Sequence, residues 1–365
     1  MLSVENIKIK KIDINLPEEF KHIKLPDLNR ETISFEIKNS NTAVANSIRR
    51  VVNGELEVNC FYLEEDNIDT NEEYIIKSEL VKRIRHIPIL QETNETKFTL
   101  NINNTTTEKI VVYSSNIVPK ICSSDFRLCQ LRPGKYINIT ITTKKGYGYE
   151  YSCYGLTSNI TYKITDYTIV SFAGPKDIQK KRVKTTELID LIKKNKLEYD
   201  SFKRILIVDK NYVKDKIKDF DIILEENIKT YQNTEIYCRD FYLEIETYGN
   251  IDSITMMHNV CNNIINRIKT ILHNMEIETD TLSIISLTEK TSIKISGEDY
   301  TIGELIRKTI YELNPSISLI NTTIEHPLQR SITINIRYTE PLVIFKQACE
   351  KIITQFEYIK SCFKS

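Results

Sequence analysis

Residues 293–308 have the sequence Ile-Lys-Ile-Ser-Gly-Glu-Asp-Tyr-Thr-Ile-Gly-Glu-Leu-Ile-Arg-Lys, and residues 35–50 have the sequence Phe-Glu-Ile-Lys-Asn-Ser-Asn-Thr-Ala-Val-Ala-Asn-Ser-Ile-Arg-Arg. The two stretches align without gaps, and each ends in a basic pair. Both begin with alternating apolar residues, which predict a half-buried strand, and pass through a polar turn into the spacing of an amphipathic helix. This internal repeat predicts two copies of one strand–helix unit.

The predicted helix of each copy has one apolar face. In the later copy, Thr301-x-x-Glu304 has the pattern of a capping box, in which both side chains accept hydrogen bonds from backbone amides at the helix start. Pro315 then marks the end of this helix. The apolar positions at helical spacing are Val44, Ile48, Val51 and Val52 in the first copy and Ile302, Leu305, Ile306, Ile310 and Leu313 in the second.

A second, longer helix is predicted to complete each copy, over residues 251–272 after a strand at 241–246 and over residues 341–363 after a strand at 331–338. Their apolar stripes are Ile254, Met257, Cys261, Ile264, Ile268 and Ile271 in the first, and Leu342, Phe345, Cys349, Ile352, Phe356, Ile359 and Phe363 in the second.

Such stripes need partners, and four of these helices together can make a shared apolar core. We therefore expect the two copies to pack as an intramolecular pseudo-dimer. The predicted dimer core comprises the apolar residues of all four helices except Ile271, Leu342, Cys349 and Phe363. The plainer alternative, core helices of two unrelated domains, is disfavoured because the same elements recur in the same order.

The first copy is interrupted between its two helices. Residues 57–235 are far more than a connection needs, so they predict an inserted, mostly-β docking domain. The fold class is α+β: residues 1–56 with 236–273 form the first dimerisation module, and residues 274–365 form the second. Within the insert we expect strands at 58–64, 97–102, 110–113, 136–142 and 160–164, a helix at 71–87, and a Lys- and Glu-rich, solvent-facing appendage with helical patches at 175–235.

The composition disfavours several classes of protein. Fifty basic residues balance fifty acidic ones, whereas a protein that holds DNA through its phosphates usually has a basic excess. Met1 to Phe20 has no apolar core, and no apolar run is long enough to cross a bilayer, so we expect an intracellular, soluble protein without a signal peptide. The eight cysteines contain no C-x-x-C pair and are expected to be reduced.

Several segments resemble the alpha-type subunits of DNA-directed RNA polymerase. Residues 45–50 are similar to the first helix of that family, and residues 78–89 resemble the helix and Ile-Pro-Leu turn that open its second domain. The repeat from Gly297 to Leu328 resembles the eleventh eukaryotic subunit, the small partner of the third-largest subunit. Motifs of the third-largest subunit are matched in order at residues 113–117, 131–135, 144–148 and 240–249.

A single chain with both partners is similar to the fused subunits of large nucleocytoplasmic DNA viruses. The resemblance implies a non-catalytic assembly platform for transcription that binds the largest and second-largest polymerase subunits and small accessory subunits. It implies no sequence-specific DNA contact and no membrane. The implied location is the host cytoplasm and the virion, with the nucleus as the alternative.

The same resemblance implies which residues contact the large subunits. The basic pair of the first helix would do so because a forked guanidinium suits carboxylates and carbonyls, and two glycine-containing segments would form a docking loop. The plainer alternative is that these are solvated charges. The implied interface residues are Asn46, Arg49, Arg50, Gly134, Lys144, Lys145, Gly146 and Gly148.

One departure from the family concerns zinc. Cellular third-largest subunits usually carry a zinc-binding cysteine cluster after the Ile-Pro-Leu turn, but here Gln91 to Thr96 contains neither cysteine nor histidine. A structural zinc site needs about four closely presented Cys or His ligands. Cys122 and Cys129 have no second pair, so we predict no structural zinc and no other cofactor.

Two rival functions remain to be weighed. Lys145 to Tyr149 fits the start of an RNP1 motif and residues 112–117 partly fit RNP2, but an RNA-recognition module needs the two on adjacent strands with a helix between them. The intervening residues show no helical period. Catalytic signatures are also absent, since the sequence contains no P-loop, H-E-x-x-H or G-x-S-x-G pattern. A stand-alone protein–protein adaptor remains the main alternative to a polymerase subunit.

Overall fold

The computed structural model has a mixed α+β fold. It describes residues 2–12, 17–20, 29–89, 96–122, 125–164, 167–173, 179–184, 205–209, 240–249, 251–277, 282–287, 290–326 and 330–364. Most of the predicted appendage at 175–235 lies outside these residues.

The chain separates into two compact units. One comprises Met1–Asn6, Phe35–Asn46 and Tyr162–Leu243, and the other comprises Ile7–Ser34, Ser47–Thr161 and Glu244–Ser365. The boundaries between the units fall inside several strands and inside the first helix.

The first repeat contributes to a four-stranded sheet. Its order is β1 (Ser3–Lys11), β2 (Asn29–Lys38), β13 (Phe241–Gly249) and β9 (Thr157–Ile164). Every second residue of β2 and β13 is buried, which is the alternation expected of a sheet with one core face. The position of β9 differs from the prediction, because residues 160–164 were expected inside the inserted domain. Alternation along the chain identifies a strand but not the sheet that it joins.

The helix of the first repeat is α1 (Thr42–Arg50), which continues as a turn of π-helix, η2 (Val51–Glu55). The Asn41 side chain accepts a hydrogen bond from the Val44 amide at 3.0 Å and so caps the helix start. Together the two segments span 42–55, which is the same length as α7 (Tyr300–Leu313) in the second repeat. The helical segments of the two aligned repeats therefore have the same length.

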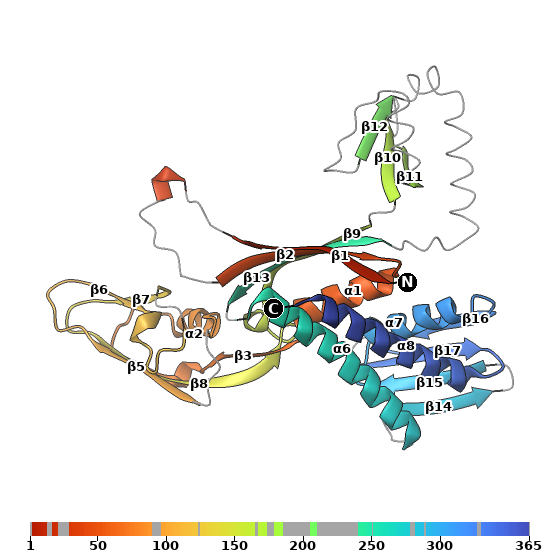
Figure 1. The fold of residues 1–365 in the computed structure, drawn as a ribbon. Coiled ribbons are helices and arrows are strands. Elements are labelled where there is room, and N and C mark those ends of the chain that lie inside the picture. Colours follow the sequence, from red (N-terminus) through yellow and green to blue (C-terminus); the bar gives the residue numbers. More distant parts are fainter. Residues whose placement is uncertain are drawn as a thin grey trace. The chain divides into compact units, whose positions relative to one another are not determined.

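The second repeat forms an antiparallel sheet with two helices. The strand order is β14 (Leu282–Leu287), β15 (Lys290–Ser296), β17 (Ser331–Arg337) and β16 (Leu319–Thr323). Helix α7 packs on β16 and β17, and α8 (Pro341–Cys362) packs on α7 (Figure 1). Gly297 makes the turn from β15 towards α7 with φ +82°, a conformation that favours glycine.

The long helix α6 (Ser253–Glu276) lies beside α8 (Figure 1). Counted from the residues before each helix, Asp252 and Glu340, seven buried apolar positions of the two helices coincide, whereas Ile265 of α6 is buried and its counterpart Ile353 is half-buried. Each buried apolar side chain of this size stabilises the fold by about 1.5–3 kcal/mol, so both stripes are major parts of the core. The matched pairs, all at most 5% exposed, are Met256 and Ile344, Met257 and Phe345, Val260 and Ala348, Cys261 and Cys349, Ile264 and Ile352, Ile268 and Phe356, and Ile271 and Ile359.

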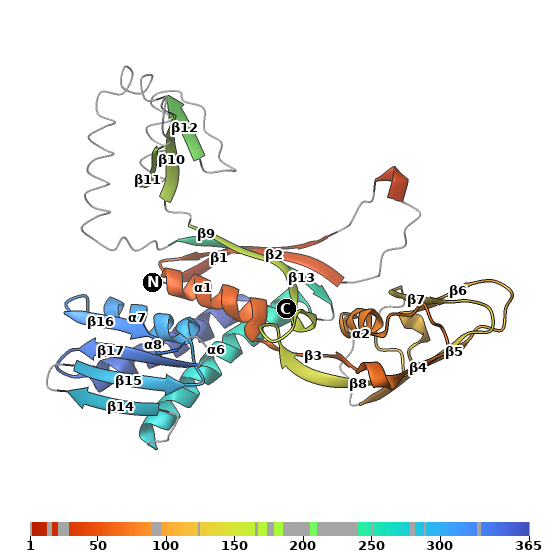
Figure 2. The same ribbon diagram turned by 180° about the vertical axis from the view of Figure 1, so that it is seen from behind.

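The inserted region has its own core. Strand β8 (Tyr136–Tyr147) pairs with β3 (Glu57–Tyr62), β4 (Ile68–Thr70) and β5 (Lys97–Asn103), while β6 (Ile110–Tyr113) pairs with β7 (Arg127–Leu131). Helix α2 (Lys77–Arg85) packs on β3 and β7 (Figure 2), and one cluster of buried apolar residues joins all of these elements.

The start of α2 differs from the predicted helix at 71–87. The Asn71 side chain accepts a hydrogen bond from the Tyr136 amide at 2.8 Å, and the Glu72 side chain accepts from the Arg132 amide at 3.0 Å. These bonds hold residues 71–72 against the strand region, so the helix begins later. Hydrogen bonds from Arg132 also lower the pKa of Glu72 to about 2.

A separate small sheet has the order β11 (Gln179–Lys184), β10 (Tyr167–Ala173) and β12 (Ile205–Asp209). Strand β11 is antiparallel to β10 and β12 is parallel to it. Within 175–235 the structure describes strands at 179–184 and 205–209, and the rest of the segment for which helical patches were predicted lies outside the described residues. Among the helices of the described ranges, none is long and apolar enough to cross a membrane.

Candidate assembly interface

The predicted dimer core is almost entirely buried. Ile254 is half-buried, and Leu313 is 39% exposed, so its assignment to the core is wrong. Leu313 is the last residue of α7, where the helix ends at Asn314 and no further turn covers the side chain. The other predicted residues are at most 1% exposed: Val44, Ile48, Val51, Val52, Met257, Cys261, Ile264, Ile268, Ile302, Leu305, Ile306, Ile310, Phe345, Ile352, Phe356 and Ile359.

The prediction omitted a second column of buried residues beside the stripe on each long helix. These residues follow or precede a stripe position by one, because a core-facing helix buries a face wider than one residue per turn. The omitted residues are Met256, Val260 and Ile265 on α6 and Ile344 and Ala348 on α8.

Helices α6 and α8 run antiparallel, as the contacts at their ends show. The His258 ring nitrogen Nε2 lies 2.7 Å from the Phe363 carbonyl oxygen, and Lys360 donates to Asn262 at 2.9 Å. At the opposite ends, Lys346 lies 3.5 Å from Glu276. The start of each helix therefore lies beside the end of the other, as expected of two helices related by an approximate twofold axis.

A buried ionic cluster connects the first repeat with the second at the start of α7. The Arg267 guanidinium of α6 pairs with Glu298 and with Glu55, the latter at 2.5 Å. Glu55 also accepts a hydrogen bond from the Thr301 hydroxyl at 2.7 Å. The Arg267 side chain is 17% exposed and that of Glu55 9%. Sequence reasoning missed this cluster because its members are distant in the chain.

A second ion pair flanks the cluster. Arg50 of α1 donates to Asp299 at 2.8 Å, and its Nε lies 3.6 Å from Glu55. Asp299 also accepts from the Thr301 amide at 2.7 Å and is the N-cap of α7. The capping box predicted from Thr301 and Glu304 is therefore wrong, because the helix begins two residues earlier than that pattern implies and the Thr301 hydroxyl binds Glu55 instead.

The electrostatics of the cluster favour its ionised form. Burial alone would lower the pKa of Arg267, but the hydrogen bonds and charges of Glu298 and Glu55 raise it overall. Burial would raise the pKa of Asp299, but hydrogen bonds from Thr301 and the charge of Arg50 hold it below its usual value. On the same helix as Arg267, burial raises the pKa of the Cys261 thiol to about 12.

The predicted large-subunit contacts of α1 fall in two environments. Asn46 and Arg49 are half-buried. Arg50 is used within the chain, in the pair with Asp299. The intramolecular role of Arg50 was not foreseen from its position in a basic pair.

The other predicted contacts do not form one docking loop. Gly134 lies in the exposed turn before β8 with φ +71°, whereas Lys144 and Lys145 lie towards the far end of that 12-residue strand. Lys145 pairs with Glu57 at 3.3 Å, and the Lys144 ammonium lies 5.1 Å from the Tyr62 ring centroid. Gly134 and the Lys144–Lys145 pair therefore lie at two separate positions along the domain and do not form the single docking loop that was predicted.

Gly146 and Gly148 have internal roles. A Cβ on Gly146 would lie 2.4 Å from the Tyr154 ring, and a Cβ on Gly148 would lie 2.9 Å from the Cα of Gly54. Gly146 is also buried. The assignment of these two glycines to an external surface is corrected: each permits a close approach inside the fold.

The structure also bears on the RNA-recognition alternative. The RNP1-like residues lie at the end of β8, whereas the RNP2-like residues lie at β6, in a different sheet. Tyr147 and Tyr149 stack on each other with ring centroids 5.3 Å apart, and the Arg330 guanidinium covers the Tyr149 ring at 4.6 Å. The two motifs therefore do not share the adjacent strands that such a module requires.

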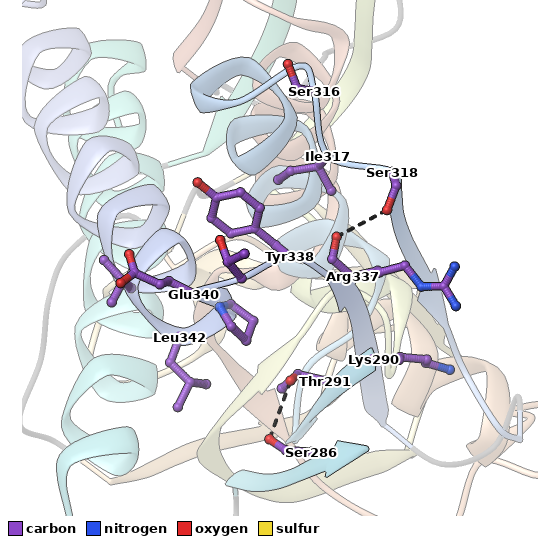
Figure 3. A pocket seen from close by; sticks show the side chains of 13 residues that line it. Ser286, Lys290, Thr291, Ser316, Ile317, Ser318, Arg337, Tyr338, Glu340 and Leu342 are labelled. Carbon is purple, nitrogen blue, oxygen red and sulfur yellow. Dashed lines mark hydrogen bonds between the residues drawn. The ribbon is translucent and has the colours of Figure 1, made fainter. Parts of the chain in front are cut away.

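The second repeat contains an open hollow of about 1000 Å³ near the start of α8. It is lined by residues of β15 and β17 and of the segments that precede β16 and α8. Figure 3 shows Lys290 and Arg337 extending away from Glu340, so the charged groups do not converge on one point.

Over the described ranges, no group of three His, Cys, Asp or Glu side chains could hold a metal ion. The absence of zinc stays a prediction, since the segment at 91–95 that motivated it lies outside those ranges.

The segment from β15 to the end of α8 contains an antiparallel sheet, a short helix and a long helix whose apolar face packs on another helix. Residues 290–361 match the family model of the RNA polymerase Rpb3/Rpb11 dimerisation domain. This match supports an alpha-like RNA polymerase subunit. A search of curated proteins finds no match to the chain.

Proposed function

We propose that this protein is a non-catalytic assembly subunit of a multisubunit DNA-directed RNA polymerase, with both dimerisation modules in one polypeptide. The observation that carries the proposal is the Rpb3/Rpb11 dimerisation-domain match at 290–361. Helix α8 of the matched domain packs on α6, which has the same register of buried positions and lies outside the match. Such a partner helix is what a second dimerisation module would supply.

The proposed mechanism is nucleation of assembly. The two modules, residues 1–56 with 236–273 and residues 274–365, bury their helices against each other and form an intramolecular pseudo-dimer. Covalent linkage fixes their ratio at one to one and gives the second module a high effective concentration near the first. The paired modules then recruit the largest and second-largest subunits, and nucleotidyl transfer belongs to those chains.

The inserted domain is the proposed contact for the second-largest subunit and the small accessory subunits. It has an independent apolar core, so it can present a rigid surface apart from the modules. Lys144, Lys145 and Gly134 remain accessible positions on that domain, and Arg49 is the proposed contact on α1.

The remaining features of this proposal come from the sequence resemblance. They are a fused subunit of a large nucleocytoplasmic DNA virus, residence in the host cytoplasm and virion, and no sequence-specific DNA contact, zinc or membrane.

Purification of the tagged chain from its native source tests the proposal, with subunit stoichiometry measured by mass spectrometry. We expect the two large polymerase subunits to be recovered at one copy each per chain. Recovery as a lone monomer would overturn the polymerase assignment and favour a stand-alone adaptor. The double variant Ile48→Asp and Ile306→Asp, which charges two fully buried positions, should lose the large subunits, while Lys97→Ala on exposed β5 surface should retain them.

A further inference from the structure

The two repeats are alike in their apolar positions but different in the polar positions beside them. Aligned by the repeat, Glu298, Asp299 and Thr301 correspond to Ser40, Asn41 and Ala43, and Glu55 corresponds to Leu313. Aligned by the burial register of the long helices, Arg267 corresponds to Gln355. The cation Arg267 and the carboxylates Glu55, Glu298 and Asp299 therefore have neutral counterparts in the other copy, whereas Arg50 corresponds to Lys308.

The neutral counterparts do not build an alternative polar network. The Ser40 hydroxyl and the Gln355 amide oxygen are both buried, and each lacks a hydrogen-bond partner among the described residues. In contrast, Arg267 has hydrogen bonds to Glu55, Glu298 and Asn263. Arg267 thus forms a buried ion pair between the repeats, in addition to the contacts at the ends of α6 and α8, and the position that corresponds to Arg267 is neutral.

We propose that the Arg267–Glu55–Glu298 network determines pairing specificity: it makes the first module pair with the second module rather than with a copy of itself. This inference rests on the proposed pairing of the two modules. On the first module the recognition residues are Arg267 and Glu55. They bind Glu298 and the Thr301 hydroxyl of the second module.

The physical reason is the cost of removing ion-pair partners from buried charges. If two first modules paired, Arg267 would keep Glu55 of its own module but would meet Ser40 in place of Glu298, and Glu55 would meet Ala43 in place of Thr301. If two second modules paired, Glu298 would meet Gln355 in place of Arg267. Like-with-like pairing therefore takes one of two carboxylates from Arg267 in the first case and the buried cation from Glu298 in the second, although the apolar stripes would fit. Specificity of this kind comes from penalising the wrong partner.

Such discrimination matters even when both modules belong to one chain. The first module is complete at residue 273, while the second, residues 274–365, must still be synthesised. At the usual rates of synthesis this takes on the order of ten seconds. During that interval the apolar stripe of the first module has only other nascent copies of itself as possible partners, so a penalty on like-with-like pairing keeps it available.

In the test, each residue of the network is replaced, in the full chain, by the residue found at the corresponding position of the other repeat. The substitutions are Glu55→Leu, Arg267→Gln, Glu298→Ser and Thr301→Ala. Two differently tagged copies are co-expressed, and capture of one through the tag of the other reports pairing between chains. Wild type should elute as a single chain of 42.6 kDa with background capture. The symmetrised variant should show capture several-fold above background and species of two or more chains by light scattering.

A milder variant, Arg267→Gln with Glu298→Gln, removes the charges but keeps similar shapes, and should shift in the same direction. The matched control is Lys294→Gln with Glu325→Gln, which neutralises an exposed ion pair of 2.8 Å within the second module and should behave as wild type.

The inference is overturned if a neutralised variant folds cooperatively and remains a single chain. It is also overturned if neither neutralised variant folds, because the network would then be needed for stability and not for the choice of partner. Both results would leave the polymerase proposal intact. Conversely, failure of the wild type to co-purify with large subunits would not affect the capture experiment.

Discussion

Helices α6 and α8 bury the same positions along their lengths, yet one carries Arg267 and the other Gln355 at the corresponding place. The shared positions show that both helices contribute an apolar face of the same kind to the core. The difference teaches that the two faces are not interchangeable, because only the α6 side supplies a buried cation to the carboxylates around the start of α7. The core and the polar cluster therefore have separate tasks: one supplies stability and the other distinguishes the partners.

The largest expected effect comes from breaking what the two copies share. Ile48 and Ile306 occupy the same position of the repeat and are both fully buried. Aspartate at either site should lower the free energy of unfolding by about 4 kcal/mol or more, because a charge is buried without a partner. Urea denaturation followed by circular dichroism measures this loss. A tolerated substitution at one site and not the other would show that the copies do not have equal roles in the core.

The next effect should sharpen the difference between the copies. Arg267→Met leaves Glu55 and Glu298 buried without their cation and should cost about 3–5 kcal/mol of unfolding free energy. The matched change Gln355→Met removes a buried amide whose oxygen has no partner, so its effect should lie within about 1 kcal/mol of zero. Equal losses at the two sites would contradict the electrostatic account.

The smallest effect concerns the caps of the two short helices, which are Asp299 for α7 and Asn41 for α1. Asp299→Asn keeps a capping side chain but loses the ion pair with Arg50, which is partly exposed, so the expected loss at pH 7 is about 0.5–1 kcal/mol.

The pH dependence of this variant has a defined sign. The pKa of Asp299 in the folded protein lies below its usual 3.8, so its stabilisation is present above about that pH and is lost as the pH falls through the folded value. Asp299→Asn should therefore flatten the acid side of the stability profile, while Asn41→Ala, which removes the cap of α1, should lower stability without changing its pH dependence.

The local sequence pattern was sufficient to predict most of the helices and strands. Strands β5 and β6 begin at the predicted residues, Lys97 and Ile110, and α6 and α8 cover the predicted segments. Alternation and helical spacing depend only on neighbouring residues, so they can be seen without knowledge of the fold. The prediction was less accurate where distant residues intervene, as at Asn71 and Glu72, whose bonds to the region of β8 delay the start of α2.

The candidate interface was predictable in its apolar part and not in its polar part. Sixteen of the predicted core residues are buried, because an apolar stripe on a helix packs against the core of the protein. Arg267 gave no comparable signal, since an arginine on a helix is more often solvated, and its partners Glu55 and Glu298 are 212 and 31 residues away. Gly146 was likewise assigned to a surface because the Tyr154 ring that covers it could not be seen in a motif.

The sequence by itself predicted a strand–helix repeat, two long apolar helices and a large insertion. Periodicity encodes which face of an element is buried, and that information is local. Only the tertiary structure decided that β9 joins the sheet of β1, β2 and β13, that α6 lies antiparallel to α8, and that Arg267 meets Glu55 and Glu298. These features depend on which distant segments meet. Whether a buried charge is stabilising or costly depends on the partner that the fold places beside it.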